Sequence, residues 1–187
     1  MGVFLMQTFS KRKIVTLLLT VALMISSSVP AFADGITSVQ FMIGQGSYFL
    51  NASPLGVNMD AAPYIDPDSG RTLVPGRYLG DALGATTNWD ANTKTVAVTG
   101  SNTTIQLVIG STTMTINGQA QTLDNAPVIK NGRAYLPARW VANALGYQVD
   151  WNAQYKVVLI WPNWTQEPSF GLTAPRSGNN VTSAQLN

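Results

Sequence analysis

The sequence contains no cysteine and no histidine in its 187 residues. A chain without cysteine forms no disulfide, so its stability must come from a buried apolar core. Its hydrophobic content of 45% is sufficient for such a core. Because it has neither imidazole nor thiol, the chain also lacks the usual ligands of soft transition metals, the base of a serine triad and the nucleophile of a cysteine triad. We therefore predict no cofactor, no metal site and no catalytic triad.

Charge is also scarce, because only 11% of the residues are charged, against about 25% in ordinary soluble domains. Three of the 11 cations lie in the basic run Lys11-Arg12-Lys13, near the N-terminus, and none of the nine acids precedes Asp34. The remaining chain is nearly neutral and has no basic patch for nucleic acid. Such a surface repels its own copies weakly, which favours a protein that associates outside the cell.

The N-terminal segment has the pattern of a secretory signal peptide. The basic run precedes a mostly apolar stretch of about a dozen residues, and Ala31 and Ala33 form an A-x-A site before Asp34. The apolar stretch is shorter than the roughly 18 to 20 residues that a membrane span needs. We therefore predict that residues 1–33 are removed, that the protein is exported, and that it keeps no stable membrane anchor.

The chain repeats itself. Residues 71–90, "RTLVPGRYLGDALGATTNWD", return at 133–152 as "RAYLPARWVANALGYQVDWN". The match extends upstream, and it predicts two tandem repeats, 34–100 and 101–162, followed by a flexible tail at 163–187. The shared positions of the motif are Arg71, Pro75, Arg77, Gly84 and Trp89 in the first repeat, and Arg133, Pro137, Arg139, Gly146 and Trp151 in the second.

Each repeat is predicted to contain short antiparallel strands and one short helix. Asn-Gly pairs at 117–118 and 131–132 suit two-residue hairpin turns, in which both positions need positive φ. Each motif proline suits a helix start, and each motif glycine suits the left-handed residue after a helix end. A helix of about nine residues is unstable alone. We therefore expect an α+β fold in which one helix per repeat packs on a sheet and both motif tryptophans are buried.

The repeated block, with its P-x-R, A-L-G and W-(D/N) elements and the Asn-Gly hairpins before it, resembles the copper amine oxidase N-terminal-like domain, also called the stalk domain. The resemblance covers roughly residues 36–161 and suggests two tandem copies. It implies a non-catalytic extension of an oxidase and an exported protein of a Gram-positive-type bacterium. It implies no copper chemistry here, because the chain has no histidine or cysteine ligand.

Some polar residues allow a chemical and a structural interpretation. Asp66, Pro67 and Asp68 resemble the start of a calcium loop, but the glutamate expected at its twelfth position is Arg77, so a turn is favoured. Arg77 and Arg139 could clamp an anion. The favoured alternative is that their stems cover the sheet and their heads bond to a turn. The aspartates near the motif tryptophans leave a secreted hydrolase as a remote alternative.

The first repeat has two loops that are longer than those of the second. The second repeat has aromatic residues near its end that the first lacks. These differences predict the contact surface, because loops vary and carry function more readily than the scaffold. Neutral drift is an equal alternative for the longer loops, since small surface insertions cost little free energy. The aromatic residues could form an exposed platform for a glycan, or could cap the core. The candidates are Pro54, Leu55, Asp66, Pro67, Asp68, Tyr155, Trp161 and Trp164.

We expect a non-catalytic structural or adhesive protein of the cell surface or extracellular matrix, with self-association or a cell-wall polymer as its partner. The alternative is a cell-wall or polysaccharide-binding module.

Overall fold

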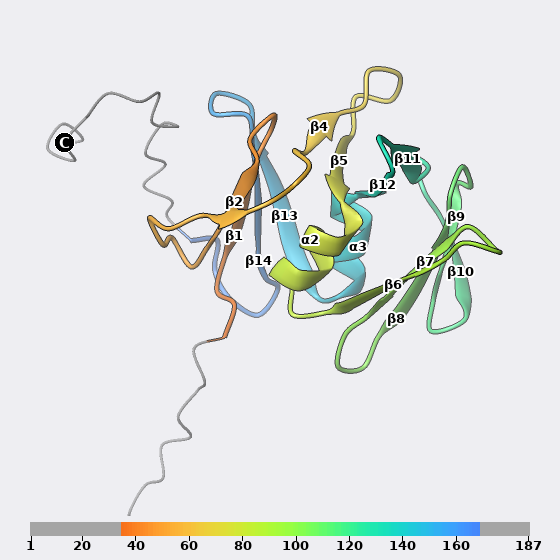
Figure 1. The fold of residues 1–187 in the computed structure, drawn as a ribbon. Coiled ribbons are helices and arrows are strands. Elements are labelled where there is room, and N and C mark those ends of the chain that lie inside the picture. Colours follow the sequence, from red (N-terminus) through yellow and green to blue (C-terminus); the bar gives the residue numbers. More distant parts are fainter. Residues whose placement is uncertain (1–34, 169–187) are drawn as a thin grey trace, which may run out of the picture. The chain divides into compact units, whose positions relative to one another are not determined.

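The chain forms fourteen strands and two helices in the computed structural model, which describes residues 35–168 (Figure 1). All of these elements lie in the unit that begins at Ile36. The predicted signal peptide, with Ala31, Ala33 and Asp34, lies outside the described residues, as does most of the predicted tail. Within residues 35–168, no helix is long and apolar enough to cross a membrane.

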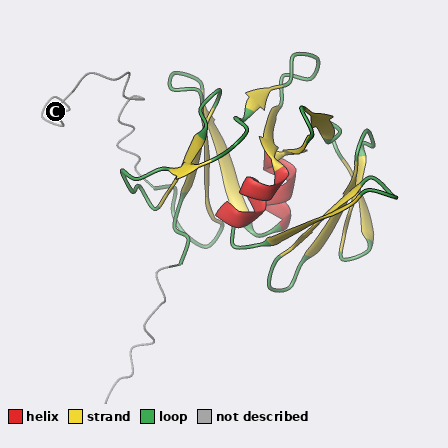
Figure 2. Cartoon of the chain, in the orientation of Figure 1, coloured by secondary structure: helices red, strands yellow, loops and turns green. Residues whose placement is uncertain are grey.

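The strands form three antiparallel sheets, which we name A, B and C (Figure 2). In spatial order, sheet A contains β13 (Tyr147–Asn152), β14 (Val157–Pro162), β1 (Val39–Met42), β2 (Ser47–Leu50) and β3 (Val57–Asn58). Sheet B contains β11 (Val128–Lys130), β12 (Arg133–Pro137), β5 (Thr72–Pro75) and β4 (Tyr64–Ile65). Sheet C contains β10 (Gln119–Thr122), β9 (Thr113–Ile116), β8 (Thr104–Val108), β7 (Thr95–Thr99) and β6 (Thr86–Asp90).

Every sheet takes strands from both halves of the chain, residues 34–100 and 101–162. In sheet A, β1 of the first half pairs with β14 of the second, and in sheet C, β7 of the first half pairs with β8 of the second. Phe41 pairs with Val158 in sheet A, and Leu107 pairs with Val96 in sheet C. The two registers correspond, because the paired residues hold equivalent positions in the two halves. Neither half completes a five-stranded sheet alone, so the halves interlock.

Sheet B joins the halves through β5 and β12, the two strands that lead into the helices. Their pairing is reciprocal, as an approximate two-fold relation between the halves requires. The facing pairs are Leu73 with Pro137, Val74 with Leu136, and Pro75 with Tyr135.

The predicted α+β fold is wrong, because strands hold 44% of the described residues and helices only 10%. Helices α2 (Gly76–Ala82) and α3 (Ala138–Ala144) have seven residues each, so each is only about 10 Å long. Such a helix is too short to form a layer over a five-stranded sheet. The fold is therefore predominantly β, with both helices placed among three antiparallel sheets (Figure 1).

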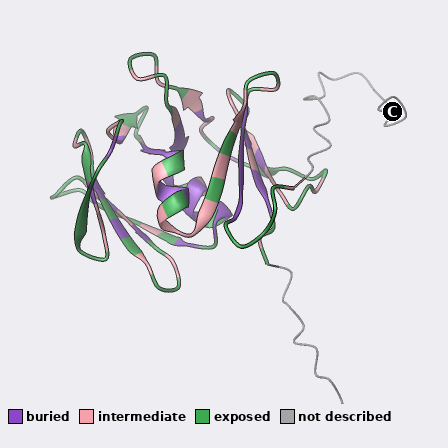
Figure 3. Cartoon of the chain, turned by 180° about the vertical axis from the view of Figure 1, so that it is seen from behind, coloured by how far each residue is buried: buried purple, intermediate pink, exposed green. Residues whose placement is uncertain are grey.

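The predicted helix limits are close to those observed. Pro75 and Pro137 are the residues directly before α2 and α3. Gly84 and Gly146 have φ values of 68° and 88°, which glycine adopts without strain. The helices end where they do because these left-handed residues turn the chain into β6 and β13. Both helices carry buried and exposed positions, as Figure 3 shows.

Both Asn-Gly turns are as predicted. Asn117 and Gly118 join β9 to β10, and all four central residues of the two turns have positive φ. Asn131 and Gly132 join β11 to β12 in the same way. These turns fix the register of their hairpins, since a two-residue loop allows only one pairing.

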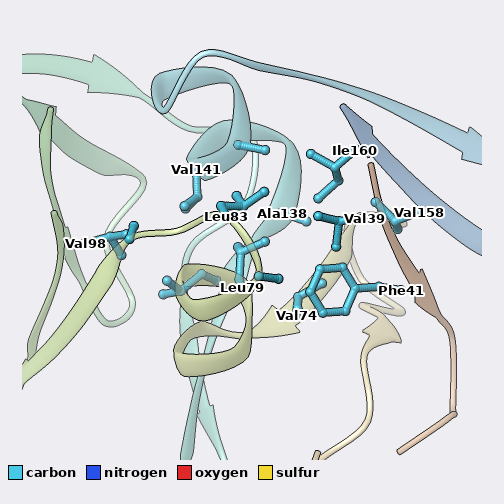
Figure 4. Close-up of a cluster of buried hydrophobic side chains, with 14 of the residues drawn as sticks. Val39, Phe41, Val74, Leu79, Leu83, Val98, Ala138, Val141, Val158 and Ile160 are labelled. Atoms are coloured by element: carbon cyan, nitrogen blue, oxygen red, sulfur yellow. The ribbon is translucent and has the colours of Figure 1, made fainter. Parts of the chain in front are cut away.

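One apolar core joins all three sheets and both helices. Leu79 of α2 and Val141 of α3 are fully buried in it. Figure 4 shows these residues with Val98 of sheet C and Phe41 of sheet A. Because this core draws on both halves, its burial stabilises the interlocked arrangement.

Candidate functional site

The contact residues predicted from sequence do not form one site. Leu55, in the loop before β3, is 80% exposed, and Pro54 beside it is also exposed. Pro67 and Asp68 are exposed in the turn between β4 and β5. None of the eight predicted contact residues lines any of the three hollows described below.

Asp66 closes its own turn. Its carboxylate accepts hydrogen bonds from the hydroxyl and the backbone N–H of Ser69, at 2.6 and 3.2 Å. The backbone N–H of Gly70 donates to the carbonyl of Asp66 at 2.8 Å. These bonds agree with the interpretation of 66–70 as a turn rather than a calcium loop.

The C-terminal aromatic residues divide into buried and exposed ones. Trp161 is only 8% exposed and packs with Val157 and Leu159, and Tyr155 lies partly buried against them. Trp161 is therefore not available as part of an exposed platform. Trp164 is 74% exposed, and its ring centroid lies 6.4 Å from that of Tyr147.

The motif arginines of the hairpins clamp one half to the other. Arg71 of the first half forms an ion pair with Asp124 of the second, with Nε 2.7 Å from Oδ2. Arg133 of the second half pairs with Asp60 of the first, and its Nε donates to both carboxylate oxygens at 3.1 and 3.2 Å. The two clamps occupy corresponding positions, which explains why the arginine occurs in both halves.

Each clamp lies at the edge of a groove, and an aromatic residue from the helix reaches it. Tyr78 of α2 accepts a hydrogen bond on its hydroxyl oxygen from the backbone N–H of Asp60, at 3.1 Å. Trp140 of α3 donates its indole N–H to Asp124 at 2.6 Å. Trp140 is partly buried against the core, and it also lines the groove beside this polar bond.

The first groove, which we call the Trp89 groove, has a volume of about 820 Å³ and lies between α2, β6 and the β11–β12 hairpin. Its walls include two exposed apolar side chains, Trp89 and Ile129, each 47% exposed. The prediction that Trp89 is buried is therefore wrong. The strand that carries it, β6, is the edge of sheet C. Charged residues on the wall are Asp60, Arg77, Asp81 and Arg133.

The second groove, which we call the Trp151 groove, lies at the corresponding place beside α3, β13 and β5. Its volume is about 260 Å³. Trp151 is partly buried and packs against the core, and so does Trp140. The same framework therefore gives a larger groove in the first half and a smaller one in the second.

The remaining motif arginines, Arg77 and Arg139, are exposed on the walls of the two grooves. Nε of Arg77 lies 3.8 Å from Oδ2 of Asp81, which is one helical turn away. The exposed side chain of Arg77 does not cover a sheet, which is the role that the sequence interpretation favoured. Both arginines instead line a groove, Arg77 the Trp89 groove and Arg139 the one beside Trp151.

A third hollow, of about 330 Å³, adjoins the Trp89 groove, and Asp60 and Arg133 line both. Tyr64 lies on its wall, with the ammonium of Lys130 3.7 Å from the ring centroid. Tyr135 packs edge-on against Tyr64, with ring centroids 5.0 Å apart. The ion pair between Asp60 and Arg133 thus borders both hollows.

Asp60, on the wall of the Trp89 groove, has a lowered pKa. The side-chain hydrogen bond from Arg133 is the chief cause that holds the pKa of Asp60 below its ordinary value of 3.8. Hydrogen bonds from Thr93 and from the backbone N–H of Asn92 lower the pKa of Asp90. A general acid for hydrolysis at neutral pH needs the opposite shift.

The donor set does not fit copper. The full sequence has no histidine or cysteine, and residues 35–168 hold no group of three or more acidic, histidine or cysteine side chains that could bind a metal. Oxygen ligands from scattered aspartates do not suit copper.

Sequence reasoning missed Asp60 and Asp124, the acids of the two clamps. A signal was present, because "MDAAP" at 59–63 matches "LDNAP" at 123–127. The aspartate is the polar position that this short match preserves, and its arginine partner is a motif residue of the other half.

A family model described as the copper amine oxidase N-terminal domain matches residues 49–160. The single match crosses both halves and does not divide them into two copies. The comparison with curated proteins gives no match.

Proposed function

Because the chain belongs to the copper amine oxidase N-terminal domain family, we propose that it is an exported, non-catalytic structural or adhesive component of the cell surface or extracellular matrix. The domain that gives the family its name is a non-catalytic stalk. The observation that carries the proposal is the use of the motif residues. The hairpin arginines tie the halves together, the helices contribute apolar side chains to the core, and the glycines with positive φ end the helices.

We further propose that the two halves are tandem copies of one unit that fold only together. The reciprocal register between β5 and β12 and the matching clamps support this view. A rigid interlocked framework suits a load-bearing or adhesive module, since its parts cannot separate without losing the common core.

A cell-wall or polysaccharide-binding role is the second candidate, and the exposed ring of Trp89 favours it. The low charge of the chain favours self-association as well. The C-terminal segment and the loop at Leu55 remain candidate contact surfaces for a second copy.

The test is to express the full chain in a Gram-positive host and fractionate the culture. The proposal expects a protein shortened at Ala33 in the wall, matrix or medium, retained on insoluble wall material or assembled into particles that sediment faster than a monomer. A full-length protein that stays in the cytoplasm, or an exported monomer that neither binds nor assembles, would overturn it.

A further inference from the structure

We propose that the Trp89 groove and the adjoining hollow form one track that binds an uncharged, β-1,4-linked pyranose polysaccharide. The inference rests on the adhesive function proposed above and names the ligand class of its site.

The two hollows meet at one ion pair. The Trp89 groove, of about 820 Å³, and the adjoining hollow, of about 330 Å³, share Asp60 and Arg133 in their linings. The groove is lined by Ile129 and Ala134 on one face of the β11–β12 hairpin, and the hollow by Lys130 and Tyr135 on the other face. A ligand longer than one sugar ring that binds in the Trp89 groove can therefore reach the adjoining hollow only past this ion pair.

Trp89 provides a stacking surface in the larger hollow. Its side chain is 47% exposed on an edge strand, and it faces Val96, which is buried at 1% exposure, on the neighbouring strand. The pairing holds the backbone of β6 in place, and nearly half of the Trp89 side chain stays accessible to a ligand. A β-linked pyranose presents a flat face of C–H groups, which packs on an aromatic ring, and its hydroxyls remain free for polar partners.

The charges of the track suit an uncharged ligand. Arg133 is held by Asp60, and Arg77 lies 3.8 Å from Asp81. Lys130 stands over the ring of Tyr64. An anionic polymer would need a cluster of unpaired cations, as charge-assisted recognition requires. The paired groups instead offer adjacent donors and acceptors, which match the hydroxyl groups of a sugar.

The Trp151 groove serves as an internal comparison. Its volume is about 260 Å³, and Asp124 already accepts bonds from both Arg71 and the indole of Trp140. Trp151 is partly buried against the core. The corresponding groove therefore lacks both the space and the exposed ring, and we assign no ligand to it.

The experiment is affinity electrophoresis of the secreted protein in gels that contain hydroxyethylcellulose or glycol chitin, which are uncharged β-1,4-linked polymers. Dextran, which is α-linked, and polyglutamate, which is anionic, are the comparison polymers. The variants are Trp89→Ala, Trp89→Phe and, as a matched control, Trp164→Ala. Trp164 is also an exposed tryptophan but lies outside all three hollows. Thermal melts check that each variant folds.

We expect at least one β-1,4-linked polymer to retard the parent and Trp164→Ala equally. Trp89→Ala should bind about tenfold more weakly, and Trp89→Phe should keep part of the affinity, because one aromatic contact supports roughly that change. The inference is overturned if Trp89→Ala binds like the parent, if neither β-1,4-linked polymer retards the parent, or if polyglutamate alone does. Binding of an extended peptide along the edge strand β6, in place of a polysaccharide, would also overturn the inference.

Retention on wall material separates this inference from the proposed function. If Trp89→Ala and the parent are retained equally, adhesion stands and the track is not its site. If the parent is not retained and does not assemble, the adhesive function itself fails.

Discussion

The Trp89 and Trp151 grooves are built by the same motif, yet they differ in their capacity to hold a ligand. In each groove, a helix lies beside an ion pair, which joins a hairpin arginine of one half to an aspartate of the other half. In the first groove the helix contributes Tyr78, and in the second it contributes the larger Trp140. The comparison teaches that the motif specifies the framework, whereas a few unmatched side chains determine whether a groove is open.

The helices differ in a related way. Gly76 and Gly80 of α2 correspond to Ala138 and Ala142 of α3. A Cβ on Gly76 would lie 2.9 Å from the side chain of Leu136, and a Cβ on Gly80 would lie 2.1 Å from Oγ1 of Thr87. The first helix therefore approaches its neighbours more closely than an alanine would allow.

The largest expected effect on stability concerns the leucines that directly follow the two helices. Leu83 is 5% exposed, whereas its counterpart Leu145 is only partly buried. We expect Leu83→Ala to lower the free energy of unfolding by about 2 to 5 kcal/mol, as truncation of a buried leucine does. Leu145→Ala should cost clearly less. Urea denaturation of both variants measures the difference, and equal losses would contradict the asymmetry of burial.

A smaller effect is expected where α2 meets β6. Gly80→Ala places a methyl group against Thr87, and such overpacking costs about 1 to 3 kcal/mol. The better helix propensity of alanine offsets up to about 1 kcal/mol of this loss. The double variant Gly80→Ala/Thr87→Ala should regain stability relative to Gly80→Ala, because the second change removes the clashing hydroxyl. A double variant less stable than Gly80→Ala in the same urea series would show that the contact is not the cause.

The smallest effect concerns the clamp between Asp60 and Arg133, and it depends on pH. The pKa of Asp60 is lowered in the folded protein, chiefly by the hydrogen bond from Arg133. Its carboxylate therefore stabilises the fold above the ordinary pKa, 3.8, and that stability is lost as the pH falls through the lowered pKa. Thermal melts should show Asp60→Asn less stable than the parent at pH 7, with the gap closing in acid. A difference in stability between Asp60→Asn and the parent that stays constant down to about pH 2 would contradict the clamp.

Much of the local structure could be predicted from the sequence, because it depends on neighbouring residues. The Asn-Gly turns and the glycines after the helices impose their backbone angles locally. The fold class and the site could not be predicted in this way. Pairing between β1 and β14 joins residues more than a hundred positions apart, and no local pattern encodes it.

The tryptophans illustrate the same limit. Trp89 and Trp151 occupy equivalent motif positions, so the sequence predicted the same burial for both. Trp89 lies on β6 and Trp151 on β13, and both strands are edge strands that pack against the helix before them. The difference in exposure between the two rings therefore does not follow from the strand position, and only the assembled fold shows it.

The central claim, that the halves form one interlocked unit, is tested most directly by producing residues 34–100 and 101–168 as separate fragments. Each lacks the partner strands that complete its sheets. We therefore expect neither fragment alone to give a cooperative thermal transition by circular dichroism. An equimolar mixture should form a one-to-one complex that melts cooperatively. A fragment that folds and melts cooperatively as a monomer would contradict the interlocked fold.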